Sequence, residues 1–413
     1  MNFIDLFYFL IAAITICAGN YTTLFYAEST DAISGDLGSI ERQSILIISL
    51  IMSLILFSLS DRKQFRKKIF KSLKYLVFIA FLVISVAVNR INPESFRKIG
   101  ILSIIFANIF LCSFFYKDKF IDKTFDAISF FLLASFAVSP FFDAFYHSYE
   151  IDAIRYGGSF RGLFAHKNIC GAVSALCSLY YLYQLLLKPK SRKKIFLFFC
   201  LVFILFFTFS GASIGLFVSF CFLIYLFTNP QVPKSIFFSS SALVVVFSLC
   251  FVCLNPFKDE NITSRIELQK DILADTGFTL FGTGYESYFK SGRDSLVNNI
   301  YSSLDWRTKA VNTHNGYIDL FINNGMTGLI IFVLIFIWPV IKKGLSKSAT
   351  NASGLPSIAS ILVIFLCIQN LFEGNFYNPN NIGWFFIILC DIGVQSDETC
   401  KENISNNSIL QRC

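Results

Sequence analysis

Residues 99–116 read IGILSIIFANIFLCSFFY and contain no charged side chain. An α-helix needs about 20 mostly apolar residues to cross a bilayer, so this stretch predicts a transmembrane helix. The rest of the chain repeats the pattern, because 55% of its 413 residues are hydrophobic and only 15% are charged. This composition excludes a secreted, fibrous or disordered protein and predicts an all-α polytopic membrane protein.

Apolar runs divide the chain into about twelve predicted transmembrane helices. The runs lie at 3–19, 44–60, 73–89, 99–116, 125–143, 168–187, 195–209, 213–228, 236–254, 326–341, 357–372 and 383–394. The last run is short, so a total of eleven stays open. The first run lacks the basic segment of a cleavable signal peptide, and we expect it to be retained.

The positions of these runs predict four regions. Residues 1–254 hold nine transmembrane helices joined by short loops, and residues 255–325 form a long hydrophilic loop that is partly helical. Residues 326–394 hold three more helices, and residues 395–413 form a tail.

The basic residues predict the orientation of the helices. One set of alternate short connections carries 18 Lys and Arg residues, whereas the other set carries 7. Positive charge favours the cytoplasmic side, so both termini are expected in the cytoplasm and the stretches 144–167 and 255–325 outside. The net charge of +8 follows from these clusters and does not indicate a nucleic-acid partner.

The twelve cysteines lie mostly inside apolar runs, where they are expected to act as small core residues rather than as disulfides. Cys250 and Cys253 form a C-x-x-C, but no second pair or nearby histidine accompanies it. We therefore predict neither a metal nor a redox role for this pair.

A first group of candidate residues lies in RYGGSFRGLFAHKN, residues 155–168, with Gly171 shortly after. Arg155, Arg161 and Lys167 gather just before an apolar run, and Asn168 is a plausible N-cap. A helix N-terminus with cations nearby is suited to an anion such as a phosphate. The alternative is that these cations anchor a helix end among lipid headgroups, although they lie on the side where positive charge is usually avoided.

A second group lies in the long outer loop. It comprises NITSRIEL around Arg265, the Gly282-x-Gly284 pair, and THNGYID around His314. The apolar spacing after Thr313 predicts a short helix capped by Thr313, with His314 in its first turn and an end near Gly325. The glycine pair is a weak signal, since no βαβ unit surrounds it.

All three histidines of the chain fall in the two outer stretches, at 147, 166 and 314. Histidine is the side chain best suited to proton transfer near neutral pH, so chemistry at the outer face is one interpretation. The other is that loops simply tolerate histidine, and that His314 has a structural role.

Together the two groups resemble the bacterial O-antigen ligase and polymerase superfamily, which includes exopolysaccharide polymerases. The run from Arg161 to Gly171 is similar to a signature after the family's fifth or sixth helix. The Ser264-Arg265 stretch, Gly282-x-Gly284 and the His314 segment through Gly325 are similar to its long periplasmic loop. One departure is that Phe209-Ser210-Gly211-Ala212-Ser213 lacks an arginine that members often carry there.

The resemblance implies a GT-C-type glycosyltransferase of the inner membrane whose active site faces the periplasm. The donor would be a glycan on undecaprenyl diphosphate, and the acceptor a further glycan or lipid A core, with membrane lipid and a chain-length regulator protein as other partners. Arg161, Arg265 and His314 would be catalytic. The residues expected to bind the diphosphate or substrate are Arg155, His166, Lys167, Asn168, Asn315 and Tyr317.

The mechanism that the resemblance implies is an inverting displacement in which arginines hold the diphosphate and His314 takes the acceptor proton. No DxD pair occurs in the outer segments, so we expect no metal and no other cofactor. The loop also contains aromatic residues that either stack on sugars or pack the loop against the membrane. They are Tyr285, Tyr288, Trp306 and Tyr317.

Three functions stay open at this point. An O-antigen or exopolysaccharide repeat-unit polymerase is favoured over an O-antigen ligase by the His166-Lys167-Asn168 stretch. A flippase or transporter of lipid-linked oligosaccharides is the different class. It is disfavoured because the apolar runs hold almost no ionisable residues, with Asp391 a rare exception near an end.

Overall fold

The computed structural model describes most of the predicted membrane helices. The described residues are 3–17, 40–60, 65–89, 93–116, 119–139, 145–146, 159–164, 167–187, 191–228, 239, 260–285, 288, 313–345, 357–374, 376 and 382–392. Apart from one pair of two-residue strands, the regular structure in these residues is helical. The prediction of an all-α membrane protein is therefore confirmed.

The helices follow the apolar runs along the chain. They are α1 (Phe3–Cys17), α3 (Ile40–Ser58), α4 (Phe65–Asn89), α5 (Pro93–Tyr116), α6 (Phe120–Ala137), α8 (Lys167–Leu187), α9 (Arg192–Phe207), α10 (Gly211–Thr228), α12 (Glu260–Thr276), α14 (Gly316–Phe332), the π-helical η6 (Val333–Ile337), α15 (Trp338–Leu345) and α16 (Ile358–Gln369). A last apolar helix spans Ile382–Ile392.

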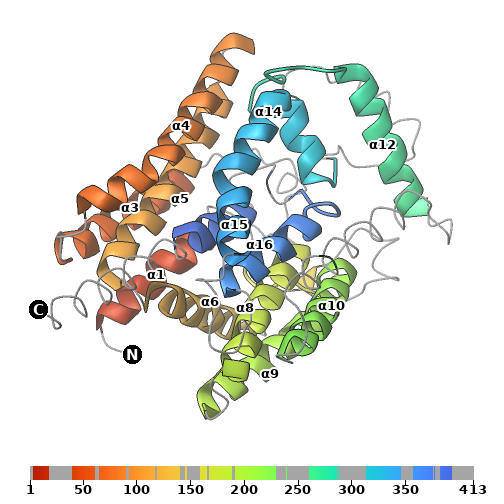
Figure 1. Ribbon diagram of the computed structural model, residues 1–413. Helices are drawn as coiled ribbons and strands as arrows, with labels where there is room; N and C mark the ends of the chain where they lie inside the picture. The colour runs from red at the N-terminus through yellow and green to blue at the C-terminus, as the bar shows by residue number, and fades with distance from the viewer. Residues whose placement is uncertain are drawn as a thin grey trace, which may run out of the picture.

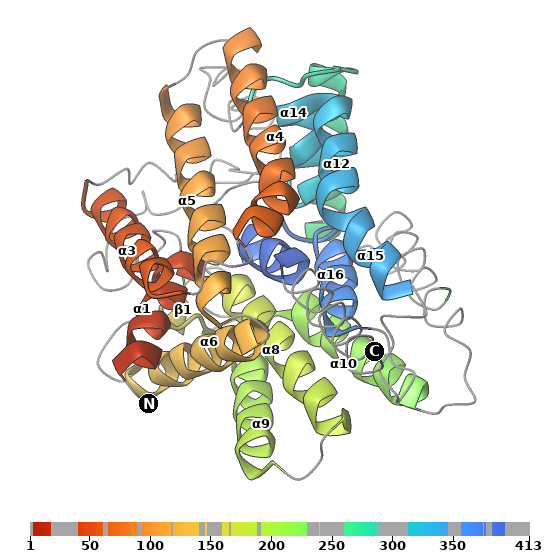
Figure 2. The ribbon, with the colours of Figure 1, turned by 60° about the vertical axis from the view of Figure 1, so that its left-hand side comes forward.

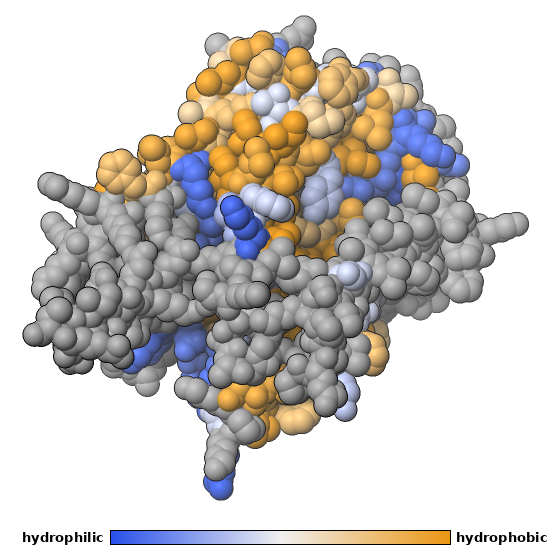
Figure 3. All heavy atoms as spheres, in the orientation of Figure 1, coloured by the Kyte–Doolittle hydropathy of each residue, from blue (hydrophilic) through white to orange (hydrophobic). Residues whose placement is uncertain are grey.

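Four helical segments of the described chain are long and apolar enough to cross a membrane. They are Ser72–Asn89, Pro93–Tyr116, Lys167–Leu187 and Gly316–Lys342. Figure 3 shows apolar side chains over much of the upper described surface, whereas hydrophilic ones gather over α12 at the upper right. Exposed apolar side chains of this kind are expected where lipid, rather than water, surrounds the helices.

Eleven of the twelve predicted runs fall on these helices. The remaining run, 236–254, lies outside the described residues except for position 239. The total of twelve transmembrane helices thus stays a prediction.

The predicted helix at 125–143 is displaced in the structure, where α6 starts at Phe120. The earlier start carries charged residues that the apolar run left out. Asp122 accepts a hydrogen bond from the hydroxyl of Tyr180, and Lys123 Nζ donates to Asp5 Oδ1 at 2.8 Å. The start of α6 is therefore held to α8 and α1 by polar contacts that a search for apolar runs does not detect.

The helices pack as neighbours along the chain and across it. In Figures 1 and 2, α8, α9 and α10 form the lower part of the molecule, and α4 stands beside α14 in the upper part. Helix α16 lies between these parts and contacts both α10 and α8. Helix α12 packs on the start of α14 through a small apolar cluster of Leu268, Ile272, Tyr288 and Ile322.

An ionisable residue inside an apolar run has its charge neutralised. Asp391 is 2% exposed, and its carboxylate pairs with Lys74 Nζ at 2.5 Å and accepts a hydrogen bond from the Tyr75 hydroxyl. A buried carboxylate without such partners would be costly in a membrane protein. The contacts join α4 to the last helix.

Helix α14 is interrupted at Gly325, where φ is 68°. An extended segment lies against the interruption and forms hydrogen bonds with backbone groups of α14 there. The amides of Thr283 and Thr327 donate to the carbonyls of Ile322 at 2.9 Å and Leu280 at 3.1 Å. The outer loop and the membrane helix therefore form one hydrogen-bonded unit, as buried backbone groups require.

The Gly282-x-Gly284 pair serves this packing. The Gly284 amide donates to the Asn323 carbonyl at 2.9 Å. A Cβ on Gly282, where φ is 71°, would overlap the backbone of Asn323. These glycines permit close approach of two backbones. This packing role explains the glycine pair, and no dinucleotide-binding role is needed.

Gly325→Ala is expected to destabilise the protein by about 2 kcal/mol or more, because the left-handed backbone is strained for alanine and the new Cβ would overlap the Leu280 carbonyl. Gly215→Ala is the control, since a Cβ there meets nothing within 4 Å and Gly215 lies inside α10. That variant should be neutral or up to about 1 kcal/mol more stable. Thermal unfolding of both in detergent checks this, and equal midpoints would contradict it.

Candidate functional site

Arg265 is positioned by the apolar face of α12. Leu268 and Ile272 lie three and seven residues after it, on the same side of the helix, and both are buried against α14. Burial of this face turns Arg265 inward. Its Nη1 donates to the carbonyl of Phe372 at 3.4 Å, just past the end of α16.

Lys167 and Asn168 enter the same region from the start of α8. The side-chain amide of Asn168 donates to Glu373 Oε1 at 2.7 Å, and Lys167 is only 9% exposed. The expectation that Asn168 caps the helix is wrong, because α8 begins one residue earlier, at Lys167. The amide instead joins α8 to the segment that follows α16.

Glu373 is the residue that these elements share, and the sequence did not reveal it. It is half-buried, and burial raises its pKa to about 6, although Arg265, the hydrogen bond from Asn168 and Lys167 all act to lower it. The only signal was an acidic residue at the start of the outer connection 373–382. Its partner Asn168 lies 205 residues away along the chain, and Arg265 contacts the residue before Glu373 from 107 residues away, so sequence spacing could not identify them.

His314 lies in the turn that leads into α14, with φ of 55° in the left-handed region. The predicted cap is corrected here: Asn315, not Thr313, is the N-cap, and its Oδ1 accepts from the amides of Tyr317 and Ile318 at 3.1 and 3.3 Å. His314 thus precedes the helix instead of lying in its first turn. The side chain of Asn315 is engaged in the cap.

Two contacts hold the His314 turn against the elements that carry Arg265 and Glu373. Gln269 Nε2, one helical turn after Arg265 on α12, donates to the Thr313 carbonyl at 3.0 Å. The Gly316 amide donates to the carbonyl of Asn370 at 2.9 Å, and a Cβ on Gly316 would overlap the Asn370 side chain. Glycine at 316 therefore allows α14 to start directly against the end of α16.

The aromatic residues of the loop are mostly packing residues. Tyr285 and Tyr288 are each 1% exposed, so neither offers a ring face to a sugar. The hydroxyl of Tyr317 donates to the Cys367 carbonyl at 2.9 Å and fastens α14 to α16. Trp306 lies outside the described residues.

Arg161 lies on a different element. It follows the strand β2 (Ser159–Phe160), which pairs antiparallel with β1 (Phe145–Tyr146). The next residues pack on the C-terminal end of α6, where the Leu163 amide donates to Ser135 Oγ at 2.8 Å. Arg155 and His166 lie outside the described residues.

Polar side chains occupy the position where an arginine is missing. Ser210 Oγ donates to Ser213 Oγ at 3.0 Å, and Gln369 Nε2 donates to the same Ser213 oxygen at 3.2 Å. A Cβ on Gly171 would overlap Ser210, so glycine lets α8 pack closely on this junction. The start of α10 therefore contacts α8 and α16 through neutral polar groups.

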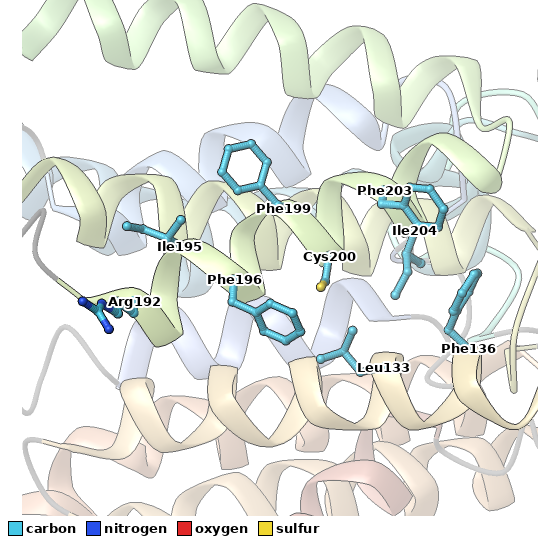
Figure 4. Close-up of a pocket in the computed structure, with 9 residues that line it drawn as sticks. All are labelled: Leu133, Phe136, Arg192, Ile195, Phe196, Phe199, Cys200, Phe203 and Ile204. Carbon is cyan, nitrogen blue, oxygen red and sulfur yellow. The ribbon is translucent and has the colours of Figure 1, made fainter.

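The pocket between α6 and α9 is a poor candidate for a charged ligand. It has a volume of about 700 Å³, and its lining is apolar apart from Arg192 and Cys200. Figure 4 shows Phe196, Leu133 and Phe136 in the space between the two helices. It contains none of the residues predicted for the site, and the exposed phenylalanines of α9 are suited to lipid.

The family described as O-Antigen ligase matches residues 196–333. The match covers α9, α10, α12 and α14, including Arg265 and His314, and it confirms the resemblance to the O-antigen ligase and polymerase superfamily. The Lys167 and Glu373 positions lie on either side of it. No curated protein matches the chain.

Proposed function

From the premise that this chain carries the domain of the O-antigen ligase and polymerase superfamily, we propose that it is an inner-membrane glycosyltransferase. It moves a glycan from undecaprenyl diphosphate to a sugar hydroxyl at the periplasmic face. The most specific form of the proposal is a repeat-unit polymerase of O-antigen or exopolysaccharide. Both termini are then cytoplasmic, as the distribution of Lys and Arg predicts.

The observation that carries this proposal is the meeting of cations from distant parts of the chain. Lys167 at the start of α8 and Arg265 on α12 both act on Glu373, beside the turn that holds His314. Fixed cations and a helix N-terminus are suited to a diphosphate. We assign the acceptor hydroxyl to the imidazole of His314, whose turn contacts α12 and the end of α16.

The chemistry follows from these roles. The bond between the anomeric carbon and the diphosphate oxygen breaks while the acceptor oxygen bonds to the same carbon from the opposite side. The electron pair of the broken bond leaves with undecaprenyl diphosphate, whose growing charge Arg265 and Lys167 stabilise, with Arg161 and Arg155 in support. His314 takes the proton of the acceptor hydroxyl, and one displacement inverts the anomeric configuration. The cations neutralise the leaving group, so the proposal includes no metal.

The glycan profile of a strain lacking this protein tests the proposal and its competitors. A polymerase leaves single capped repeats, whereas an O-antigen ligase leaves long chains on the carrier lipid. Lipid-linked repeats that stay on the cytoplasmic side would indicate a flippase and overturn the glycosyltransferase. Restoration by the wild-type chain is the control, and an unchanged profile would also contradict the proposal.

A further inference from the structure

Glu373 is an unexpected residue in a site that would bind a diphosphate. Its carboxylate accepts a hydrogen bond from Asn168 at 2.7 Å and interacts electrostatically with Arg265 and Lys167. These partners come from α12 and the start of α8, while Glu373 itself follows α16. A negative charge at this place opposes the binding of another anion, so its presence needs a physical reason.

The reason lies in the two cations. Lys167 is 9% exposed and Arg265 is half-buried, and Arg265 Nε has no hydrogen-bond partner in the described part of the chain. Two cations held together away from water are unstable unless an anion accompanies them. Glu373 is an internal anion that meets this requirement when no ligand is bound.

We propose that Glu373 is a positioning residue. Its carboxylate, held by Asn168, pairs with Lys167 and Arg265 and keeps them together before the donor binds. When the donor binds, its diphosphate replaces the carboxylate as the partner of the two cations. This inference rests on the proposed function. It adds a residue outside the matched domain and predicts how the donor competes with it.

The proposal gives donor binding a definite dependence on pH. Because burial raises the pKa of Glu373 to about 6, the carboxyl is largely neutral below pH 6 and charged above it. Lys167 and Arg265 are the charged groups that act on it. A diphosphate favours the neutral form, since like charges repel. Donor affinity is therefore expected to fall as pH rises through about 6, and the donor should raise the pKa of Glu373 in return.

The test measures binding of undecaprenyl diphosphate to the full chain in nanodiscs of neutral phospholipid between pH 5 and pH 8. Wild type should lose about tenfold in affinity over this range, a coupling of ordinary size. Glu373→Gln should bind at all pH values as wild type does at pH 5. His314→Asn should keep the wild-type profile, which separates Glu373 from a titrating histidine.

Asn168→Ala provides a second test that does not alter the carboxyl group. The hydrogen bond from Asn168 lowers the pKa of Glu373, so its loss should move the midpoint of the profile to higher pH. This variant decides the matter if Glu373→Gln does not fold, as judged by gel filtration and thermal unfolding. An unmoved midpoint would count against the proposal.

The outcomes separate the two levels of inference. If the pH dependence survives in Glu373→Gln, or disappears in His314→Asn, Glu373 does not have this role while the proposed function stands. If wild type binds no undecaprenyl diphosphate at any pH, the proposed function fails and this inference fails with it.

Discussion

Arg265→Ala is expected to lower glycan transfer by about 10²–10³-fold, the usual cost of removing one group that stabilises developing charge. Arg265 reaches the carbonyl of Phe372 from α12 and shares Glu373 with Lys167. Its loss would remove one of the two main cations that stabilise the departing diphosphate. Polymer formed in a cell, or transfer by purified protein from a lipid-linked donor, measures the effect.

Two further variants make this test specific. Lys270→Ala removes a cation from the exposed side of the same helix and should leave transfer unchanged. Arg265→Lys keeps the charge but loses the planar fork of the guanidinium, so it should restore only part of the activity. Protein levels should match wild type in all three variants. Full activity of Arg265→Ala at normal levels would remove this residue from the site.

His314→Asn is expected to lower transfer by about 10²–10⁴-fold, the usual contribution of a general base. The backbone at 314 has φ of 55°, a conformation that asparagine tolerates better than most residues. The variant therefore removes the imidazole while sparing the turn that Gln269 and Gly316 hold in place. Single-turnover transfer from a bound donor measures the loss.

His314→Ala is the matched comparison, because alanine at this φ adds backbone strain of about 1–2 kcal/mol. Both variants should be inactive, but only the alanine variant should unfold at a lower temperature. If His314→Asn transfers glycan at the wild-type rate, the imidazole is not the base, and the structural interpretation of this histidine is correct.

Recognition of the membrane helices depended only on local sequence. Runs such as 99–116 and 168–187 correspond closely to α5 and α8, because a lipid-spanning helix must be apolar along its own length. The start of α6 was misplaced because Asp122 and Lys123 there are charged, and they are stabilised by Tyr180 of α8 and Asp5 of α1. The hydropathy of a single run does not reveal polar contacts between helices.

The candidate site was predicted only in part. Lys167, Asn168 and Arg265 were identified by charge and by resemblance, and the structure brings all three to Glu373. Glu373 itself was missed, since an isolated carboxylate in a loop has no local pattern. Arg161 was grouped with the others; it lies on the turn after β2 that packs on α6, and its place in the site stays a prediction.

The sequence by itself determined the membrane class, the positions of most helices and the resemblance to a superfamily, because each depends on residues that are close together in the chain or on the order of its motifs. Only the tertiary structure decided which charges meet, where α14 breaks and how the turn at His314 is held. Those features arise between residues as far apart as 168 and 373, whose contact depends on how α8, α12 and α16 pack together.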